Sequence, residues 1–186
     1  MPTALLIGNT EYKIDSDFRA CLRIILAFED NELTPQEKQI ILLSIMYPKV
    51  PKDIEQALIQ ANWFLNCGKK NGGEETQQPR VYSFSKDAGF IFAAFKQIHN
   101  IDLQETDLHW WKFSALFMTL FGTETAFGNL VGIRHRIATG KATKEERAAA
   151  REMGDMLDVP EIDARTLEEK EAEIKFLRLV AQGTKK

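Results

Sequence analysis

The chain has 186 residues, of which 44% are hydrophobic and 27% are charged, and its formal net charge is −3. No apolar run approaches the roughly 18 residues that a membrane-spanning helix needs, and the mean hydropathy is −0.27, so a membrane protein is excluded. The near balance of acidic and basic residues argues against nonspecific nucleic-acid binding, because such binding needs a net positive surface that displaces counterions. We expect a globular protein with a substantial core.

The start of the chain and the two cysteines indicate the compartment. Residues 1–10 contain no basic region and only a short apolar stretch at 4–7, so no secretory signal is predicted. Cys21 and Cys67 lack CxxC spacing, and the chain has no Asn-x-Ser/Thr acceptor. We therefore expect a reducing cytoplasm, with both cysteines acting as small buried apolar residues.

Residues 1–67 carry signals for three helices. Residues 15–28 place apolar side chains at helical spacing, with Ser16 or Asp17 as the cap. Residues 34–46 open with a Thr-Pro-Gln-Glu capping box, in which proline takes the first helical position. Residues 51–67 repeat the amphipathic pattern and end before a glycine. The sequence therefore predicts an N-terminal three-helix segment.

Residues 68–80 form a polar segment. Between Gly68 and Pro79 there is no apolar residue, and three of the residues are glycines. The order Gly-x-x-x-x-Gly-Lys-Ser/Thr of a phosphate-binding loop is absent, and no strand precedes the segment. We predict a flexible linker or an exposed loop, which leaves open whether it joins two helical lobes.

Residues 81–140 are the most apolar part and predict three helices, at 84–98, 104–121 and 123–139. The middle helix contains the run Leu108-His109-Trp110-Trp111-Lys112-Phe113. Helical projection places four large side chains on one face, and these are Trp110, Phe113, Phe117 and Leu120. A helix this apolar is typical of the centre of a bundle, so Trp110 is the better core anchor. Trp111, beside Lys112, is the better candidate for a partly exposed contact.

Residues 141–186 differ in amino-acid composition from the apolar part that precedes them. Residues 141–158 predict an exposed helix that opens with a capping box from Thr143 to Glu146. Residues 166–181 predict a final amphipathic helix, which packs either on its own domain or on another subunit. The fold class expected is all-α, a multi-helix orthogonal bundle of about seven to eight helices, with two helical lobes joined by the polar linker as the alternative.

The sequence contains no convincing catalytic or metal-binding pattern. His99, His109 and His135 are scattered, HExxH and GxGxxG are absent, and the paired acidic residues fit a solvated surface. We expect no cofactor, no metal and no enzyme activity. One basic cluster is a candidate for nucleic acid, but it lacks aromatic residues and contains two glutamates, so solvated helix ends explain it better: Arg134, His135, Arg136, Lys141, Lys144 and Arg147.

Several stretches together resemble the phage Gp-fifteen-type family of tailed phages and prophages of Gram-positive bacteria. The residues that show it are Tyr82-Ser83-Phe84-x-Lys86-Asp87-Ala88, Ile91-x-Ala93-Ala94-Phe95, Ile101-Asp102-Leu103, and Leu108-His109-Trp110-Trp111-Lys112-Phe113-x-Ala115-Leu116. Leu120, Phe127 and Ile133-Arg134 look like its continuation, and looser similarity reaches back to Asp17-Phe18-Arg19. The resemblance covers roughly residues 12–137, and its His-Trp-Trp-Lys-Phe run is the specific part.

The resemblance implies a role in tail morphogenesis. Members lie near the tape-measure and major tail proteins, which implies a tail-assembly chaperone in the bacterial host cytoplasm. It would bind the tape-measure protein until tail-tube subunits cover that protein, and no catalytic residues come with the family. We also expect a homo-oligomer. The candidate contact residues are Trp110, Trp111, Phe113, Phe117 and Arg134.

Other functions remain as alternatives. The first is a structural tail-completion or connector component that stays in the virion. The second is a small nucleic-acid-binding helical module that uses the basic cluster between Arg134 and Arg147. An enzyme is the least favoured, since no group of residues has the pattern of an active site.

Overall fold

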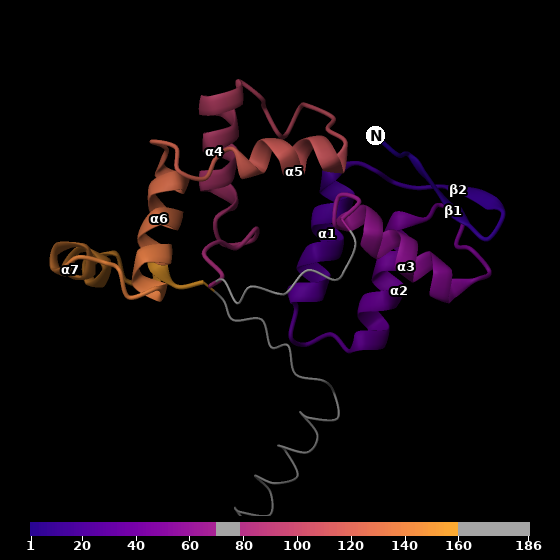
Figure 1. Cartoon of the computed structure of the whole chain (residues 1–186), viewed down its shortest axis with the longest axis horizontal. Helices are drawn as coiled ribbons and strands as arrows, with labels where there is room; N and C mark the ends of the chain where they lie inside the picture. Colours follow the sequence, from indigo (N-terminus) through magenta and orange to yellow (C-terminus); the bar gives the residue numbers. More distant parts are fainter. Residues whose placement is uncertain (70–78, 160–186) are drawn as a thin grey trace, which may run out of the picture.

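The computed structural model describes residues 1–69 and 79–159. Within them a β-hairpin precedes seven α-helices and a short 3-10 helix (Figure 1). The elements are β1 (Ala4–Ile7), β2 (Thr10–Lys13), α1 (Phe18–Glu29), α2 (Pro35–Met46), α3 (Ile54–Leu65), α4 (Ala88–His99), α5 (Trp110–Met118), α6 (Ala126–Ala138), α7 (Lys144–Met153) and η1 (Gly154–Leu157). The predicted, mostly helical fold is confirmed.

The hairpin is an element that the all-α prediction lacked. β1 pairs antiparallel with β2, and Gly8 takes a φ of +60° in the turn between them. Leu5 and Ile7 are buried whereas Leu6 is 60% exposed, which is the alternation of a strand with one face on the core. The short apolar stretch at residues 4–7 is therefore a strand that packs against α3.

Side-chain caps begin most of the helices, and those at Asp17, Thr34 and Thr143 are among the caps predicted from the sequence. Thr34 and Thr143 each form a complete capping box, at the start of α2 and of α7. Asp17, Asp53 and Thr125 accept backbone N–H groups at the starts of α1, α3 and α6. The final helix predicted at residues 166–181 lies outside the described residues.

The tryptophan helix is shorter than the sequence predicts. The predicted range was 104–121, whereas α5 runs from Trp110 to Met118. The residues before it belong to a loop that pairs with the start of α1: Asp17 and His109 form an isolated antiparallel bridge, and the Trp110 N–H donates to the Ser16 carbonyl at 2.8 Å. Residues 106–109 are not helical, because hydrogen bonds to the start of α1 take the place of helical ones.

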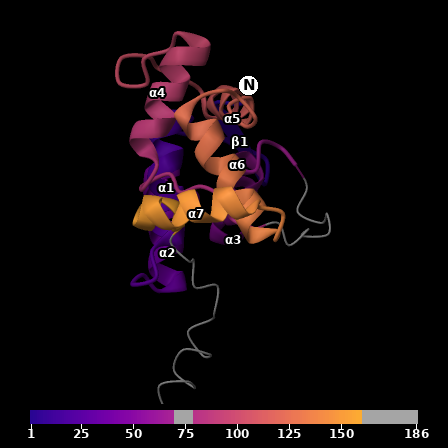
Figure 2. The ribbon, with the colours of Figure 1, turned by 90° about the vertical axis from the view of Figure 1, so that its left-hand side faces the viewer.

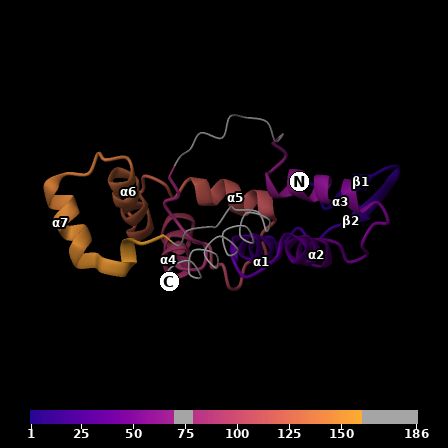
Figure 3. The ribbon, with the colours of Figure 1, turned by 90° about the horizontal axis from the view of Figure 1, so that it is seen from below.

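One hydrophobic core extends through both halves of the chain. Phe113 of α5 lies at its centre, with its ring stacked on Phe18 of α1 at 4.8 Å and on Phe95 of α4 at 5.1 Å between centroids. α6 and α7 lie at the end of the molecule opposite the hairpin (Figure 3). Figure 2 shows α7 running across α6.

The two cysteines differ in their surroundings. Both are free thiols, and Cys21 is completely buried in the core as expected. Cys67 is only partly buried, so the expectation of a buried residue is wrong there. It follows the C-terminal end of α3 with a φ of 55°, and this turn brings the chain out of the core.

Candidate functional site

Three of the five residues predicted to contact a partner lie in the core. Trp110, Phe113 and Phe117 are 5%, 1% and 3% exposed, and their rings form a stacked series along α5. Burial of rings this large is a main source of core stability. The helical projection predicted this position in the core. In this conformation these three side chains are not available to a docking protein.

Both tryptophans donate an indole hydrogen bond to the C-terminal end of α3. The Trp110 indole N–H donates to the Leu65 carbonyl and the Trp111 indole N–H to the Phe64 carbonyl, both at 2.8 Å. Those carbonyls belong to the last turn of α3, where helical carbonyls have no partner within the helix. The double tryptophan therefore caps α3 from the side while its rings fill the core.

Trp111 keeps part of its ring at the surface. It is partly buried and makes an edge contact with Trp63, with 5.5 Å between centroids. Gly68 has a φ of +79°, and a Cβ there would lie 3.0 Å from the Trp111 ring. Of the five predicted contact residues, Trp111 is the one that is partly exposed, as the sequence predicted.

His109 begins α5 as its N-cap. Its Nδ1 accepts the Trp111 N–H at 3.1 Å, so the proton lies on Nε2, which donates to the Pro2 carbonyl at 2.8 Å. His99 instead contacts the Leu116 carbonyl and the Thr119 hydroxyl. No group of three or more metal-ligating side chains occurs in the described parts of the chain.

Arg134, the fifth predicted contact residue, is also buried. Its guanidinium forms a two-pronged ion pair with Asp87, at 2.6 Å and 3.0 Å, and both side chains are at most 3% exposed. Its other hydrogen bonds go to the carbonyls of Val81, Met156 and Leu157. Arg134 thus joins α6 to α4 and η1, and the prediction of an exposed partner contact does not fit its position.

The rest of the basic cluster is partly neutralised within the protein. Arg136 pairs with Glu146 at 2.7 Å, and Arg147 donates to the Gly140 carbonyl at 3.2 Å. The hydrogen bonds from Arg136 and from the Thr143 backbone hold the pKa of Glu146 below its usual value. Arg134 and Arg136, two of the arginines proposed for nucleic acid, are therefore already paired with the carboxylates of Asp87 and Glu146.

An apolar groove lies between α1 and α4, and Phe113 of the tryptophan helix is among the residues that line it. Its volume is about 400 Å³, and Gln104 is the one polar side chain among the residues that line it: Leu22, Phe84, Ala88, Gly89, Ile91, Phe92, Leu103, Gln104 and Phe113. Gly89 stands at its edge on α4, and a Cβ there would meet no atom within 4 Å. The helix is therefore open to solvent at this point.

No pattern in the sequence predicted this groove. Its walls come from α1, from α4 and from the loop before α5, so no single stretch of sequence contains it. One signal was available: Gly89 interrupts an otherwise apolar helical pattern, and a glycine inside a helix costs stability unless close approach requires it.

The residues that carry the family resemblance meet in space. Phe18 stacks on Phe113, and the guanidinium of Arg19 donates to the carbonyls of Leu103, Gln104 and Thr106 at 2.9 to 3.3 Å. Asp87 and Arg134 form the buried pair described above. These stretches are distant in sequence, and together they form the framework of the fold.

Comparison with known families agrees with this framework. The family model for the Bacteriophage Gp15 protein matches residues 1–159. The chain belongs to the bacteriophage Gp15 family. The match is wider than residues 12–137, since it includes the hairpin at one end and η1, held by Arg134, at the other.

The Gp15 family consists of structural or assembly proteins and is not an enzyme family. No curated protein and no solved structure matches the chain. Among the described residues, no helix is both long and apolar enough to cross a membrane.

Proposed function

We propose that this Gp15 protein is a tail-assembly chaperone that binds the tape-measure protein while the tail tube is built. Membership of a phage structural or assembly family supports a role in protein assembly. The observation that supports binding is the apolar groove between α1 and α4. The partner residues proposed from sequence are thereby replaced by the groove walls, with Trp111 retained as a partly exposed neighbour on α5.

The groove is suited to the side chains of an amphipathic helix. Its lining is apolar apart from Gln104, and the small residues Ala88 and Gly89 on α4 allow another backbone to come close. Helix-in-groove recognition places apolar residues spaced three and four apart into such a hollow. A tape-measure helix bound there would have its apolar face covered, and incoming tube subunits would displace the chaperone.

The test is co-expression with the tape-measure protein of the same phage, followed by co-purification. The informative variant is Gly89→Trp, because a Cβ at this groove-lining position meets no atom within 4 Å, and we expect an indole there to obstruct the groove. The matched control is Ile98→Trp, at an exposed position on the opposite side of the same helix, outside the groove. We expect the wild type and Ile98→Trp to retain the tape-measure protein and Gly89→Trp to lose it.

The outcomes separate the role from the site. If the folded wild-type protein retains no tape-measure protein, the chaperone proposal is overturned. If Gly89→Trp binds as well as the wild type, the groove is not the docking site. Mass spectrometry of purified virions tests the structural alternative, because a chaperone is absent from finished particles and a tail-completion or connector protein is present.

A further inference from the structure

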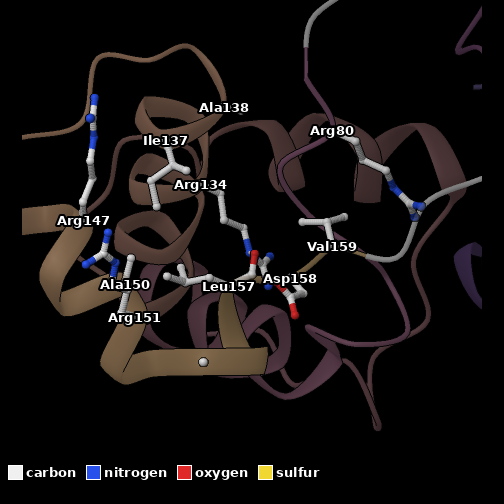
Figure 4. A pocket seen from close by; sticks show the side chains of 11 residues that line it. Arg80, Arg134, Ile137, Ala138, Arg147, Ala150, Arg151, Leu157, Asp158 and Val159 are labelled. Atoms are coloured by element: carbon white, nitrogen blue, oxygen red, sulfur yellow. The ribbon is translucent and has the colours of Figure 1, made fainter.

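A second hollow lies at the far end of the molecule, between α6, α7 and η1. It has a volume of about 920 Å³, and Figure 4 shows Arg147 and Arg151 on one side, Arg80 on the other and Arg134 between them. The residues that line this arginine pocket are Arg80, Arg134, Ile137, Ala138, Arg147, Ala150, Arg151, Gly154, Leu157, Asp158 and Val159.

The pocket has a positive rim and a partly apolar wall. Four arginines face one acidic residue, Asp158. Arg134 is neutralised by Asp87, and Arg80 pairs with Glu29 at 2.6 Å. Arg147 and Arg151 are exposed and stand four residues apart on α7, so their side chains share one side of the helix.

The apolar part of the wall is also open. Ile137 is 39% exposed, and Ala150 and Leu157 are partly buried beside it. A ligand that suits this pocket combines carboxylates, which arginine binds through paired charge-assisted hydrogen bonds, with apolar side chains that cover the wall.

The chain itself carries that chemistry directly after the pocket. Val159 is a lining residue, and the sequence that follows it, residues 161–173, contains six carboxylates against two cations. Apolar residues are interspersed among the carboxylates, and they include Ile162 and Leu167.

We propose that the arginine pocket binds the acidic segment 161–173 of the same chain. The carboxylates of the segment neutralise Arg147 and Arg151, and its apolar residues cover Ile137 and Leu157. Attachment at Val159 raises the effective concentration of the segment at the pocket, so a modest intrinsic affinity is sufficient. This binding does not involve the apolar groove, which lies between α1 and α4.

The test uses the full chain with a nitroxide label on the segment. The label is attached at Ala164→Cys in a Cys67→Ser background, and backbone amide signals are recorded by NMR. We expect broadening of the amides of Ala138, Ala150 and Leu157, with no broadening in the hairpin β1–β2. Absence of broadening at the pocket overturns the proposal.

Charge reversal identifies the contact. Arg147→Glu with Arg151→Glu is expected to abolish the broadening, while Arg23→Glu with Lys52→Glu changes the net charge equally at exposed sites outside the pocket and is expected to preserve it. Arg151→Glu alone provides the same test if the double variant fails to fold. Broadening that persists in folded charge-reversed protein overturns the proposal.

A mixing experiment distinguishes binding of the segment within its own chain from binding to the pocket of a second copy. Isotope-labelled protein without nitroxide is mixed with nitroxide-labelled protein without isotope, under conditions that allow subunits to exchange. We expect no broadening in the mixture. Broadening at the pocket would show that the segment of another copy occupies it, and would overturn the assignment to the same chain.

Discussion

Asp87 and Arg134 are 47 residues apart in sequence and form a buried, two-pronged ion pair. Asp87 also accepts the Ser83 N–H at 2.9 Å, at the entrance to α4. Arg134 uses its remaining donors on the carbonyls of Val81, Met156 and Leu157. The pair therefore connects α4, α6 and η1, and it secures the end of the region that the family model matches.

Removing the arginine leaves a buried carboxylate without its counter-charge. We expect Arg134→Met to lower the free energy of unfolding by about 3–5 kcal/mol, measured by urea denaturation. The matched control is Arg136→Met, which breaks the more exposed pair with Glu146 and is expected to cost under about 1 kcal/mol. Equal losses in the two variants would contradict the role assigned to the buried pair.

The two tryptophans are expected to differ in their effect on stability. Trp110 is 5% exposed, so Trp110→Ala should cost about 3–5 kcal/mol, and Trp111→Ala should cost less because part of its ring already meets solvent. Conservative Phe substitutions each remove one indole hydrogen bond, with an expected cost of about 1 kcal/mol. Thermal and urea unfolding of the four variants measure this. A larger loss for Trp111→Ala than for Trp110→Ala would reverse the assignment.

Replacing either of two helical glycines by alanine should change the stability of the protein, in opposite directions. A Cβ at Gly89 meets nothing within 4 Å, so Gly89→Ala should stabilise the protein by roughly 0.5–1 kcal/mol. A Cβ at Gly128 would lie 2.3 Å from the Thr123 carbonyl oxygen, so Gly128→Ala should destabilise it by about 1–3 kcal/mol. Comparing their denaturation midpoints is the measurement, and a shared direction of change would be inconsistent with this geometry.

The two thiols should react at very different rates. Burial, with smaller contributions from Asp15 and Asp17, raises the pKa of the Cys21 thiol, so little thiolate forms and reagents cannot reach it. We expect one fast thiol in a titration with Ellman's reagent, with the second reacting only on denaturation. Cys67→Ser should remove the fast phase, and a fast phase that survives in this variant would show that Cys21 is accessible.

Local signals in the sequence were sufficient for most helices. The capping boxes at Thr34 and Thr143 and the Thr125 cap depend on groups within three residues, so their positions are readable without a fold. The start of α5 was misplaced because the chain from residue 104 to 109 is held by hydrogen bonds to α1, more than 80 residues away. The strand at residues 4–7 was missed for a similar reason, since a hairpin this short depends on packing against α3.

By itself the sequence determined the helical class, the inward face of the tryptophan helix and the family, because periodicity and the His-Trp-Trp-Lys-Phe run are properties of contiguous residues. Only the tertiary structure decided what the individual side chains do. Arg134, which the sequence suggested as a partner contact, forms a buried ion pair with Asp87 in the structure. Residues of α1, α4 and the loop before α5 come together there to line a groove. Burial and pairing arise from residues that are distant in the chain, so neither can be read from local pattern.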